Sequence, residues 1–298
     1  MDNPDVESRI VDVFEIRLAD IGSVDVAQLL ALSIAVQWPH RAEDWQFMRG
    51  IGRGVVALDE IGRALGSAMW FPYSDGFAAV GMVITSPRLQ ALGTGQWLMQ
   101  RVMAECGGRT LRLNATRAAY RLYRSLDFKR SQTLFQCQGE AIAPDTAAAA
   151  AAGLRALTDA DLPALIALDA SAYGVRRAAL MTALLAQSSS LGLFRAGRLV
   201  AVALCRRFGR GHVIGPVVAS CDSDAIAVVA PHIAAHAGQF LRLDTHRPGG
   251  EFRDFLARSG LALFDAVTTM SLRRDATIAV PRIRDRPASY GVVSQAFG

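Results

Sequence analysis

A short loop with two glycines constrains the fold of this chain more than any other feature of its sequence: Gln90-Ala91-Leu92-Gly93-Thr94-Gly95. It follows the apolar run 81–85 and precedes the amphipathic run 96–105, which predicts a strand, a glycine loop and a helix in that order. Glycine lacks a Cβ, so the backbone N–H groups of the loop can approach a ligand closely. The helix N-terminus adds unpaired N–H donors and a partial positive charge. The segment is therefore predicted to hold a phosphate or a pyrophosphate.

The loop belongs to neither of two common phosphate-binding patterns. It is not the G-x-x-x-x-G-K-[ST] motif of P-loops, and it is not the G-x-G-x-x-G dinucleotide fingerprint. Its form, Q-x-x-G-x-G after a strand, resembles the acyl-CoA loop of the GNAT superfamily of N-acyltransferases. The segment from Asn114 to Phe128 resembles that superfamily's next block, a strand end followed by a helix that ends in Y-x-x-x-G-F. Asp127 stands where the family usually has Gly, and Asp tolerates the left-handed backbone that a helix end needs.

Composition narrows the class of protein. The chain has 298 residues, of which 51% are hydrophobic and 20% charged, which is typical of a globular protein of one large or two ordinary domains. The net charge of +5 comes almost wholly from arginine, because Lys129 is the only lysine. The basic residues are scattered, so no nucleic-acid partner is predicted, although positive charge favours an anionic ligand such as coenzyme A.

Neither a membrane segment nor a cysteine framework is predicted. The start of the chain is acidic and polar, unlike a secretory signal, and no apolar run is long enough to span a bilayer. The four cysteines are widely spaced and form no C-x-x-C pair, which favours a reduced cytoplasmic protein with no metal site.

An alanine-rich run divides the chain. Residues 141–153 include six consecutive alanines and predict a linker between a first domain, 1–140, and a second, 154–273, followed by a tail, 274–298. The tail is expected to lie across the surface and to dock its apolar end, Tyr290 to Phe297.

The two halves show the same order of elements. In the first half the expected strands are 13–18, 54–58, 65–71, 78–85, 110–114 and 128–136, and the expected helices are 24–36, 42–49, 94–106 and 115–126. In the second half the expected strands are 154–157, 190–194, 199–208, 211–219, 240–244 and 261–272, and the expected helices are 159–170, 176–187, 223–236 and 251–259. The order β-α-α-β-β-β-α-β-α-β, given twice, matches the GNAT order and predicts tandem α/β domains of the GNAT type, each with a mixed, mainly antiparallel sheet flanked by helices.

The second copy differs where the ligand would bind. Gly215 to Asp222 replaces the glycine loop with a proline and β-branched residues. Proline lacks an N–H and valine resists tight turns, so this copy is not expected to hold a pyrophosphate in the usual way. The resemblance covers about residues 13–273 and indicates a bacterial subgroup of two-domain GNAT proteins with a divergent C-terminal domain, which would complete the acceptor pocket or stabilise the first domain.

The resemblance implies a set of residues that bind acetyl-CoA. The loop residues Gln90, Ala91, Leu92, Gly93, Thr94 and Gly95 would hold the pyrophosphate, largely through backbone N–H groups. Val83, Ile84 and Thr85 would line the pantetheine, with a backbone N–H near Ile84 polarising the thioester. Asn114 would hydrogen-bond the pantetheine amides, and Tyr120 would pack or touch coenzyme A.

Tyr123 stands at the position that the family uses to protonate the coenzyme A thiolate. A phenol with a pKa near 10 suits a thiol with a pKa near 8.5. We therefore expect Tyr123 to be the general acid, with the alternative that it only anchors its helix.

The general base is left open by the sequence. Its candidates are His40, Glu43, Asp44 and Asp75, and deprotonation through water needs none of them. Trp38, His40, Asp44 and Asp75 are the expected acceptor-binding residues, since the 38–45 segment falls where relatives shape their acceptor site.

These observations predict an acetyl-CoA-dependent N-acetyltransferase that acts by direct attack in a ternary complex. Its acceptor would be a primary amine on a small molecule, and the loop acids favour a cationic one. The alternative is a coenzyme A-binding sensor without turnover. The acceptor, the acyl chain length and the oligomeric state, including a homodimer, stay open.

Overall fold

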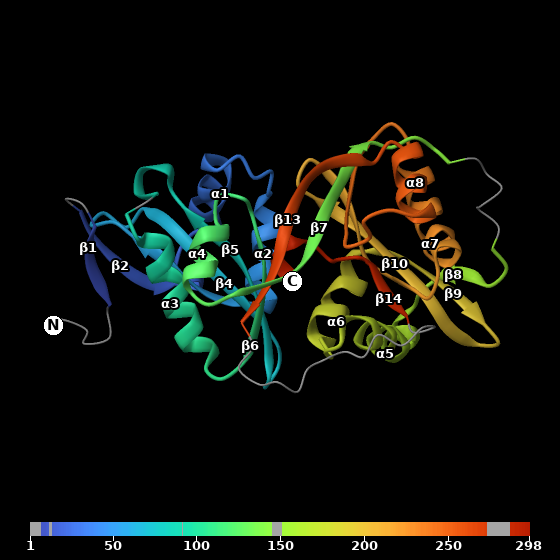
Figure 1. Ribbon diagram of the computed structural model, residues 1–298, viewed down its shortest axis with the longest axis horizontal. Helices are drawn as coiled ribbons and strands as arrows, with labels where there is room; N and C mark the ends of the chain where they lie inside the picture. The colour runs from blue at the N-terminus through green and yellow to red at the C-terminus, as the bar shows by residue number, and fades with distance from the viewer. Residues whose placement is uncertain (1–6, 12–13, 91, 145–150, 273–286) are drawn as a thin grey trace.

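The computed structural model describes residues 7–11, 14–90, 92–144, 151–272 and 287–298. Two α/β halves lie end to end in an elongated molecule, and their strands join near its middle (Figure 1). All strands form one continuous 14-stranded sheet with the order β1-β2-β3-β4-β5-β6-β13-β7-β12-β11-β10-β9-β8, and β14 pairs with β11. No helix in the described ranges is long and apolar enough to cross a membrane.

The first half follows the expected order of elements. Its strands are β1 (Ser8–Val11), β2 (Phe14–Asp20), β3 (Arg53–Leu58), β4 (Ala64–Ser74), β5 (Phe77–Thr85), β6 (Thr110–Ala115) and β7 (Lys129–Glu140). Its α-helices are α1 (Val26–Ala35), α2 (Ala42–Ile51), α3 (Thr94–Cys106) and α4 (Tyr120–Ser125). Helix α4 is shorter than the helix expected over 115–126, because Ala115 ends β6 and the Thr116 hydroxyl accepts the Ala119 N–H at 3.3 Å in a turn before the helix.

The second half repeats this order. Its strands are β8 (Leu154–Ala156), β9 (Ser189–Arg195), β10 (Arg198–Phe208), β11 (Gly211–Ala219), β12 (Phe240–Thr245), β13 (Ala262–Leu272) and β14 (Ala288–Gly291). Its α-helices are α5 (Leu162–Tyr173), α6 (Ala178–Gln187), α7 (Asp222–Ala235) and α8 (Glu251–Arg258). The last turn of the chain is the short 3-10 helix η5 (Gln295–Phe297).

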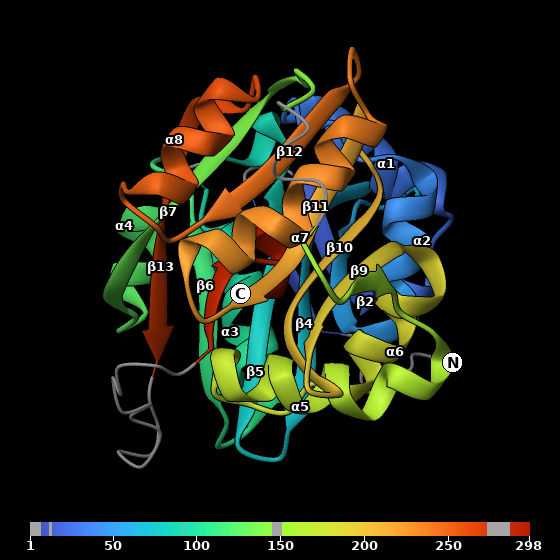
Figure 2. The ribbon, with the colours of Figure 1, turned by 90° about the vertical axis from the view of Figure 1, so that its right-hand side faces the viewer.

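The two halves exchange their last long strands. β7, from the first half, pairs antiparallel with β12 of the second half, from Phe135↔Thr245 to Glu140↔Phe240. β13, from the second half, lies between β6 and β7 and pairs antiparallel with both (Figure 2). Because these pairs carry backbone hydrogen bonds across the junction, the halves cannot separate without breaking the sheet.

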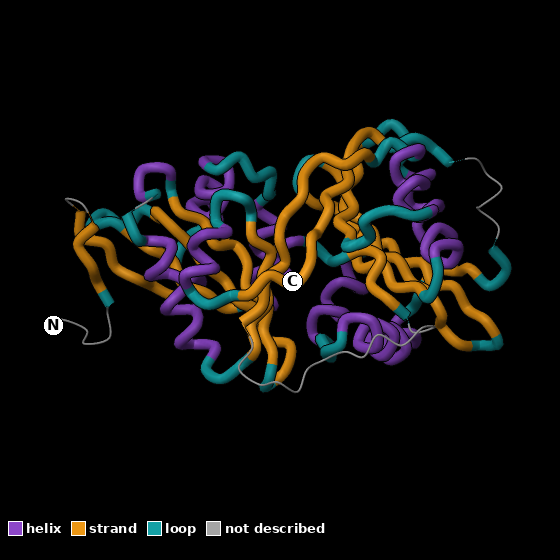
Figure 3. Tube along the Cα trace, in the orientation of Figure 1, coloured by secondary structure: helices purple, strands orange, loops and turns teal. Residues whose placement is uncertain are grey.

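Helices cover both faces of the sheet (Figure 3). One core joins apolar side chains of α1 and α2 with those of α5 and α6, so it runs across the junction on one face. On the other face, α3 and α4 cover the first half and α7 and α8 cover the second, each with a core of its own. The sheet is therefore mixed, mainly antiparallel and sandwiched by helices, as the sequence predicts.

In each half the central parallel pair of strands diverges after a few residues. β5 pairs with β6 only from Phe77↔Thr110 to Ala79↔Arg112, and β11 pairs with β12 only at two positions. The end of the chain fills part of both openings: β14 pairs with β11, and η5 packs against β5 and β6.

The expectation that the apolar end of the tail docks is confirmed for residues 287–298. Tyr290, Val293 and Phe297 are at most 2% exposed, and the Phe297 ring packs against Phe47 and Phe71. The rest of the tail and most of the alanine-rich run lie outside the described residues, so the division at 141–153 stays a prediction.

Two glycines allow the tail to lie against the sheet. A Cβ at Gly81 in β5 would stand 2.5 Å from the Ala296 carbonyl oxygen, and a Cβ at Gly215 in β11 would stand 2.0 Å from that of Val292. Real Cβ atoms do not approach backbone atoms so closely, so any side chain at these positions forces the tail away.

We predict that Gly215→Ala lowers the free energy of unfolding by about 1–3 kcal/mol, because the added methyl group overpacks the tail against β11. Chemical denaturation measures the change. The matched control is Gly50→Ala in α2, where no atom lies within 4 Å of the new Cβ. An equal loss of stability in both variants would contradict this account of the tail.

Candidate active site

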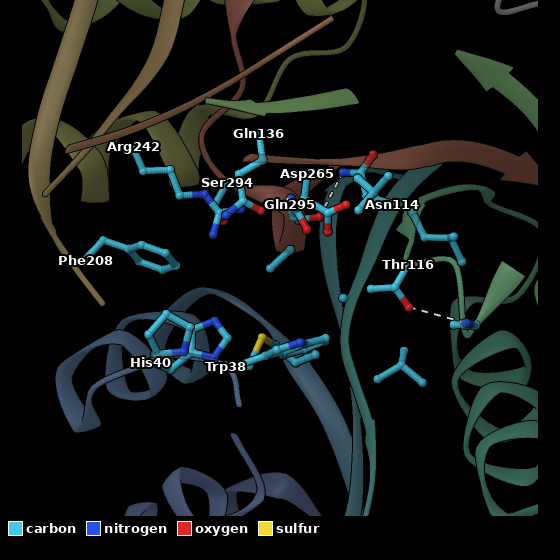
Figure 4. A pocket seen from close by; sticks show the side chains of 18 of the residues that line it. Trp38, His40, Asn114, Thr116, Gln136, Phe208, Arg242, Asp265, Ser294 and Gln295 are labelled. Atoms are coloured by element: carbon cyan, nitrogen blue, oxygen red, sulfur yellow. Dashed lines mark hydrogen bonds between the residues drawn. The ribbon is translucent and has the colours of Figure 1, made fainter. Parts of the chain in front are cut away.

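A cavity of about 400 Å³ opens where β5 diverges from β6, and both halves of the chain line it. Its lining residues are 37–40, 80–83, 113–114, 116, 119, 123, 136, 138, 208, 210, 242, 264–265, 267 and 294–296. Figure 4 shows Trp38 and His40 on one side of this space, with Arg242, Gln136 and Asp265 across from them.

The first wall is a bulged stretch of β5. The pairing of β4 with β5 steps from Ser67↔Ile84 to Met69↔Gly81, so Met82 and Val83 stand opposite a single residue. Met82 has a φ of 53°, and its carbonyl oxygen accepts the Ser67 hydroxyl at 2.8 Å. A bulge takes backbone groups out of the ladder, which leaves them free for a ligand.

The bulge changes which residues face the cavity. Val80, Gly81, Met82 and Val83 line it, whereas Ile84 lies beyond the bulge, 2% exposed in the core. Ile84, near which a polarising N–H group was expected, therefore does not line the cavity, whereas Met82 and Val83 do. Thr85 also lies off the cavity, where its carbonyl oxygen accepts the Gln90 side-chain amide at 3.4 Å.

The glycine loop has the geometry of an anion-binding site. Gly93 is the N-cap of α3 with a φ of 82°, a left-handed conformation that suits glycine. The Thr94 hydroxyl is buried without a hydrogen-bond partner in the described part of the chain. A Cβ at Gly95 would lie 3.3 Å from Thr85 Oγ1, so glycine keeps the helix close to β5. An unpaired hydroxyl at a helix N-terminus fits a pyrophosphate oxygen.

Two further observations concern the same loop. The Arg9 guanidinium reaches it from β1, with Nη1 4.0 Å from where a Gly93 Cβ would stand, which adds positive charge. Leu92 is 41% exposed, and Ala91 lies outside the described residues.

Tyr123 lies on α4 with its side chain 5% exposed, packs against Phe128 and lines the cavity. Burial raises its pKa, so the phenol is protonated at every usable pH. Tyr120, the first residue of α4, is partly buried against the core of the first half and does not line the cavity.

Asn114 lines the cavity with its amide already engaged. Its Nδ2 donates to the Gln295 carbonyl at 2.9 Å, and its Oδ1 accepts the Thr269 hydroxyl at 2.6 Å. It thus links β6 to β13 and to the tail. One amide hydrogen and one lone pair are left for the pantetheine role that the resemblance implies.

The second wall is aromatic, with Trp38 and His40 from the segment before α2 and Phe208 from the end of β10. His40 meets Trp38, Trp45 and Phe208 edge-on, with ring centroids 5.6–6.2 Å apart. Its Nδ1 is hydrogen-bonded to the Ser33 hydroxyl at 3.1 Å, so Nε2 is the nitrogen left for a ligand. Burial lowers the His40 pKa to about 4, so the imidazole is neutral at pH 7.

The acidic candidates lie elsewhere. Asp44 is 3% exposed, binds the Arg41 guanidinium at 2.9 Å and accepts the Gly209 N–H at 3.0 Å. It therefore connects the two halves. Asp75 is exposed in the turn between β4 and β5, and Glu43 is exposed on α2; neither lines the cavity. Because these acids do not line the cavity, they do not support the expectation of a cationic acceptor.

The sequence analysis missed the second half's contribution to the cavity. Asp265 and Phe264 come from β13, Arg210 from the β10–β11 turn and Arg242 from β12. Strand exchange brings β13 beside β6, and no local pattern in the sequence signals that exchange.

In the second half, β14 occupies the equivalent opening between the parallel strands. β14 pairs with Val217, Val218 and Ala219 of β11, and the Tyr290 hydroxyl donates to Asp222 at 2.8 Å at the start of α7. In the described residues, no group of three or more His, Cys, Asp or Glu side chains could hold a metal ion.

Comparison with protein families agrees with this architecture. Residues 25–128 match a family model described as the acetyltransferase (GNAT) family, and residues 165–279 match one described as an acetyltransferase (GNAT) domain. Together the two matches span more than half of the chain. No curated protein matches the sequence.

Solved structures share the fold over nearly the whole chain. A protein from Pyrococcus horikoshii, provisionally described as an acetyltransferase, has a TM-score of 0.77 at 18% identity over 98% of both chains. A tandem GNAT protein of the clavulanic acid biosynthesis pathway has a TM-score of 0.63 at 14% identity, over 88% of this chain and 99% of its own. A GCN5-related N-acetyltransferase from Sphaerobacter thermophilus has a TM-score of 0.60 at 15% identity, over 86% of this chain and 96% of its own.

The half-buried, neutral His40 predicts that the protein loses stability in mild acid. The unfolded histidine, with a pKa near 6.5, takes up a proton that folded His40 refuses until about pH 4. The free energy of unfolding should fall by about 1–3 kcal/mol for this residue as the pH drops from 6.5 to 4.

Denaturant unfolding at several pH values measures this loss. His40→Phe keeps an aromatic ring and should reduce the slope of the unfolding free energy against pH. Part of that slope should remain in the variant, because burial also lowers the pKa of the buried His232 to about 4. An unchanged slope in His40→Phe would contradict the assignment.

Proposed function

The chain belongs to the GNAT superfamily as a tandem of two GNAT domains, and from this premise we propose that it transfers an acetyl group from acetyl-CoA to a primary amine by direct attack in a ternary complex. Its fold supports N-acetyltransferase activity in general. The observation that carries the finer proposal is that the bulged β5 and the Tyr123 side chain border one cavity, which extends to the second half.

The first half supplies the groups for acetyl-CoA. The N–H groups at the start of α3, the Thr94 hydroxyl and Arg9 suit the pyrophosphate. Val80 to Val83 would border the pantetheine, and the bulge N–H groups would polarise the thioester carbonyl. The second half does not offer an equivalent place, because β14 fills it. We infer one acetyl-CoA site per chain.

Two proton transfers accompany the reaction. As the amine nitrogen bonds to the carbonyl carbon, the C–S bond breaks and the thiolate needs a proton, which the Tyr123 hydroxyl would give. Burial raises the pKa of that phenol, which keeps it protonated and able to donate when the thiolate forms.

The amine must also lose a proton. Of the four candidates from the sequence, only His40 lines the cavity, and the structure adds Asp265. The Asp265 carboxylate carries the charge that attracts an ammonium group, while neutral His40 can accept a proton directly or through water. The comparisons do not favour the alternative of a silent coenzyme A sensor.

We predict that Tyr123→Phe lowers kcat about 100-fold and leaves the affinity for acetyl-CoA within about twofold, because only the proton donor is lost. Thiol release in the presence of an amine measures kcat, and calorimetry measures the affinity. Tyr120→Phe is the matched control, since Tyr120 lies on the same helix but off the cavity. Unchanged turnover in Tyr123→Phe would remove Tyr123 from the mechanism.

A further inference from the structure

The charges at the cavity come from the second half and are of both signs. Arg210, Arg242 and Asp265 are the charged side chains that line it within the described ranges. Arg242 is neutralised internally, because its guanidinium donates to both carboxylate oxygens of Asp244 at 2.9 and 2.6 Å. Neither Arg210 nor Asp265 has an ion-pair partner among the described residues. One guanidinium and one carboxylate are thus left for a ligand.

Arg210 stands in a turn that the first half holds in place. Gly209, its neighbour, donates its N–H to Asp44 at 3.0 Å, and a Cβ at Gly209 would lie 2.9 Å from the Pro39 carbonyl oxygen. The Arg210 guanidinium stacks on the Phe240 ring, 4.6 Å from its centroid. A guanidinium fixed by stacking retains its forked donors for a carboxylate.

Asp265 is placed by a bulge in β13. The pairing with β7 steps from Leu263↔Cys137 to Asp265↔Gln136, so Phe264 is the extra residue. Phe264 lines the cavity with its side chain 65% exposed, and Asp265 follows it on the wall. Bulges redirect side chains in this way beside binding sites.

We propose that the acceptor is an amino carboxylic acid, whose ammonium group faces Asp265 and whose carboxylate binds Arg210. Trp38, Phe208 and Phe264 would contact the apolar part between the two charged groups. This inference rests on the proposed function for the reaction, but the recognition itself is a binding property.

The test compares aminocarboxylates of increasing length with the alkylamines that lack the carboxylate: glycine with methylamine, γ-aminobutyrate with propylamine, and ε-aminocaproate with pentylamine. Calorimetry measures their binding to the protein saturated with free coenzyme A, where no turnover occurs. At one of these chain lengths the aminocarboxylate should bind about 10- to 100-fold more tightly than the matching alkylamine, because its carboxylate forms a charged hydrogen-bonded pair with Arg210. With acetyl-CoA, kcat/KM should show the same preference.

Variants assign the preference to its residues. Arg210→Gln should abolish the preference for the aminocarboxylate while leaving the affinity for the alkylamine within about twofold. Asp265→Asn should weaken the binding of both the aminocarboxylate and the alkylamine. Arg207→Gln is the matched control, because Arg207 is exposed, carries the same charge and does not line the cavity. Aminocarboxylates that bind no better than alkylamines at any length, or a preference that survives Arg210→Gln, would overturn the proposal. Binding with the predicted preference but without acetylation would instead count against the proposed function alone.

Discussion

The exchange of β7 and β13 between the halves is the constraint on which the rest of the structure depends. Each half has the elements of a GNAT domain, but the strand that completes the sheet beside β6 comes from the other half. This pairing places the β13 bulge, and with it Asp265, against the cavity of the first half. A second copy of the domain is therefore part of the site and not an appendage.

The tail gives the two halves different roles. In the second half it pairs with β11 along the opening between parallel strands, and in the first it packs at Gly81 and leaves a cavity beyond the bulge. The same tail thus fills the opening in the second half and forms one wall of the cavity in the first. The expectation that Gly215 to Asp222 replaces the glycine loop is wrong for its first part, because Gly215 and Pro216 lie within β11, and only Ser220 and Cys221 separate that strand from α7.

Much of the fold followed from the sequence because it is encoded locally. The glycine loop gave the start of α3 to the residue, and alternation of apolar residues gave β11 and most other strands. The site was less predictable. Tyr123, expected from its motif, lines the cavity, whereas Ile84 does not, because the bulge at Met82 places Gly81 to Val83 on the cavity wall instead. Asp44 proved to be a buried link between the halves, and Arg210 and Asp265 depend on contacts between residues more than 120 positions apart, which no local pattern encodes.

The central claim is that the first half alone offers a coenzyme site, completed by the second. The most direct measurement is calorimetric titration of the full chain with acetyl-CoA, read for affinity and stoichiometry. The account predicts one site per chain with a micromolar dissociation constant, about 8 kcal/mol of binding free energy. A stoichiometry of two sites would mean that the ligand displaces β14 from its place beside β11. A failure to bind either acetyl-CoA or coenzyme A would contradict the assignment of the cavity as an acyltransferase site.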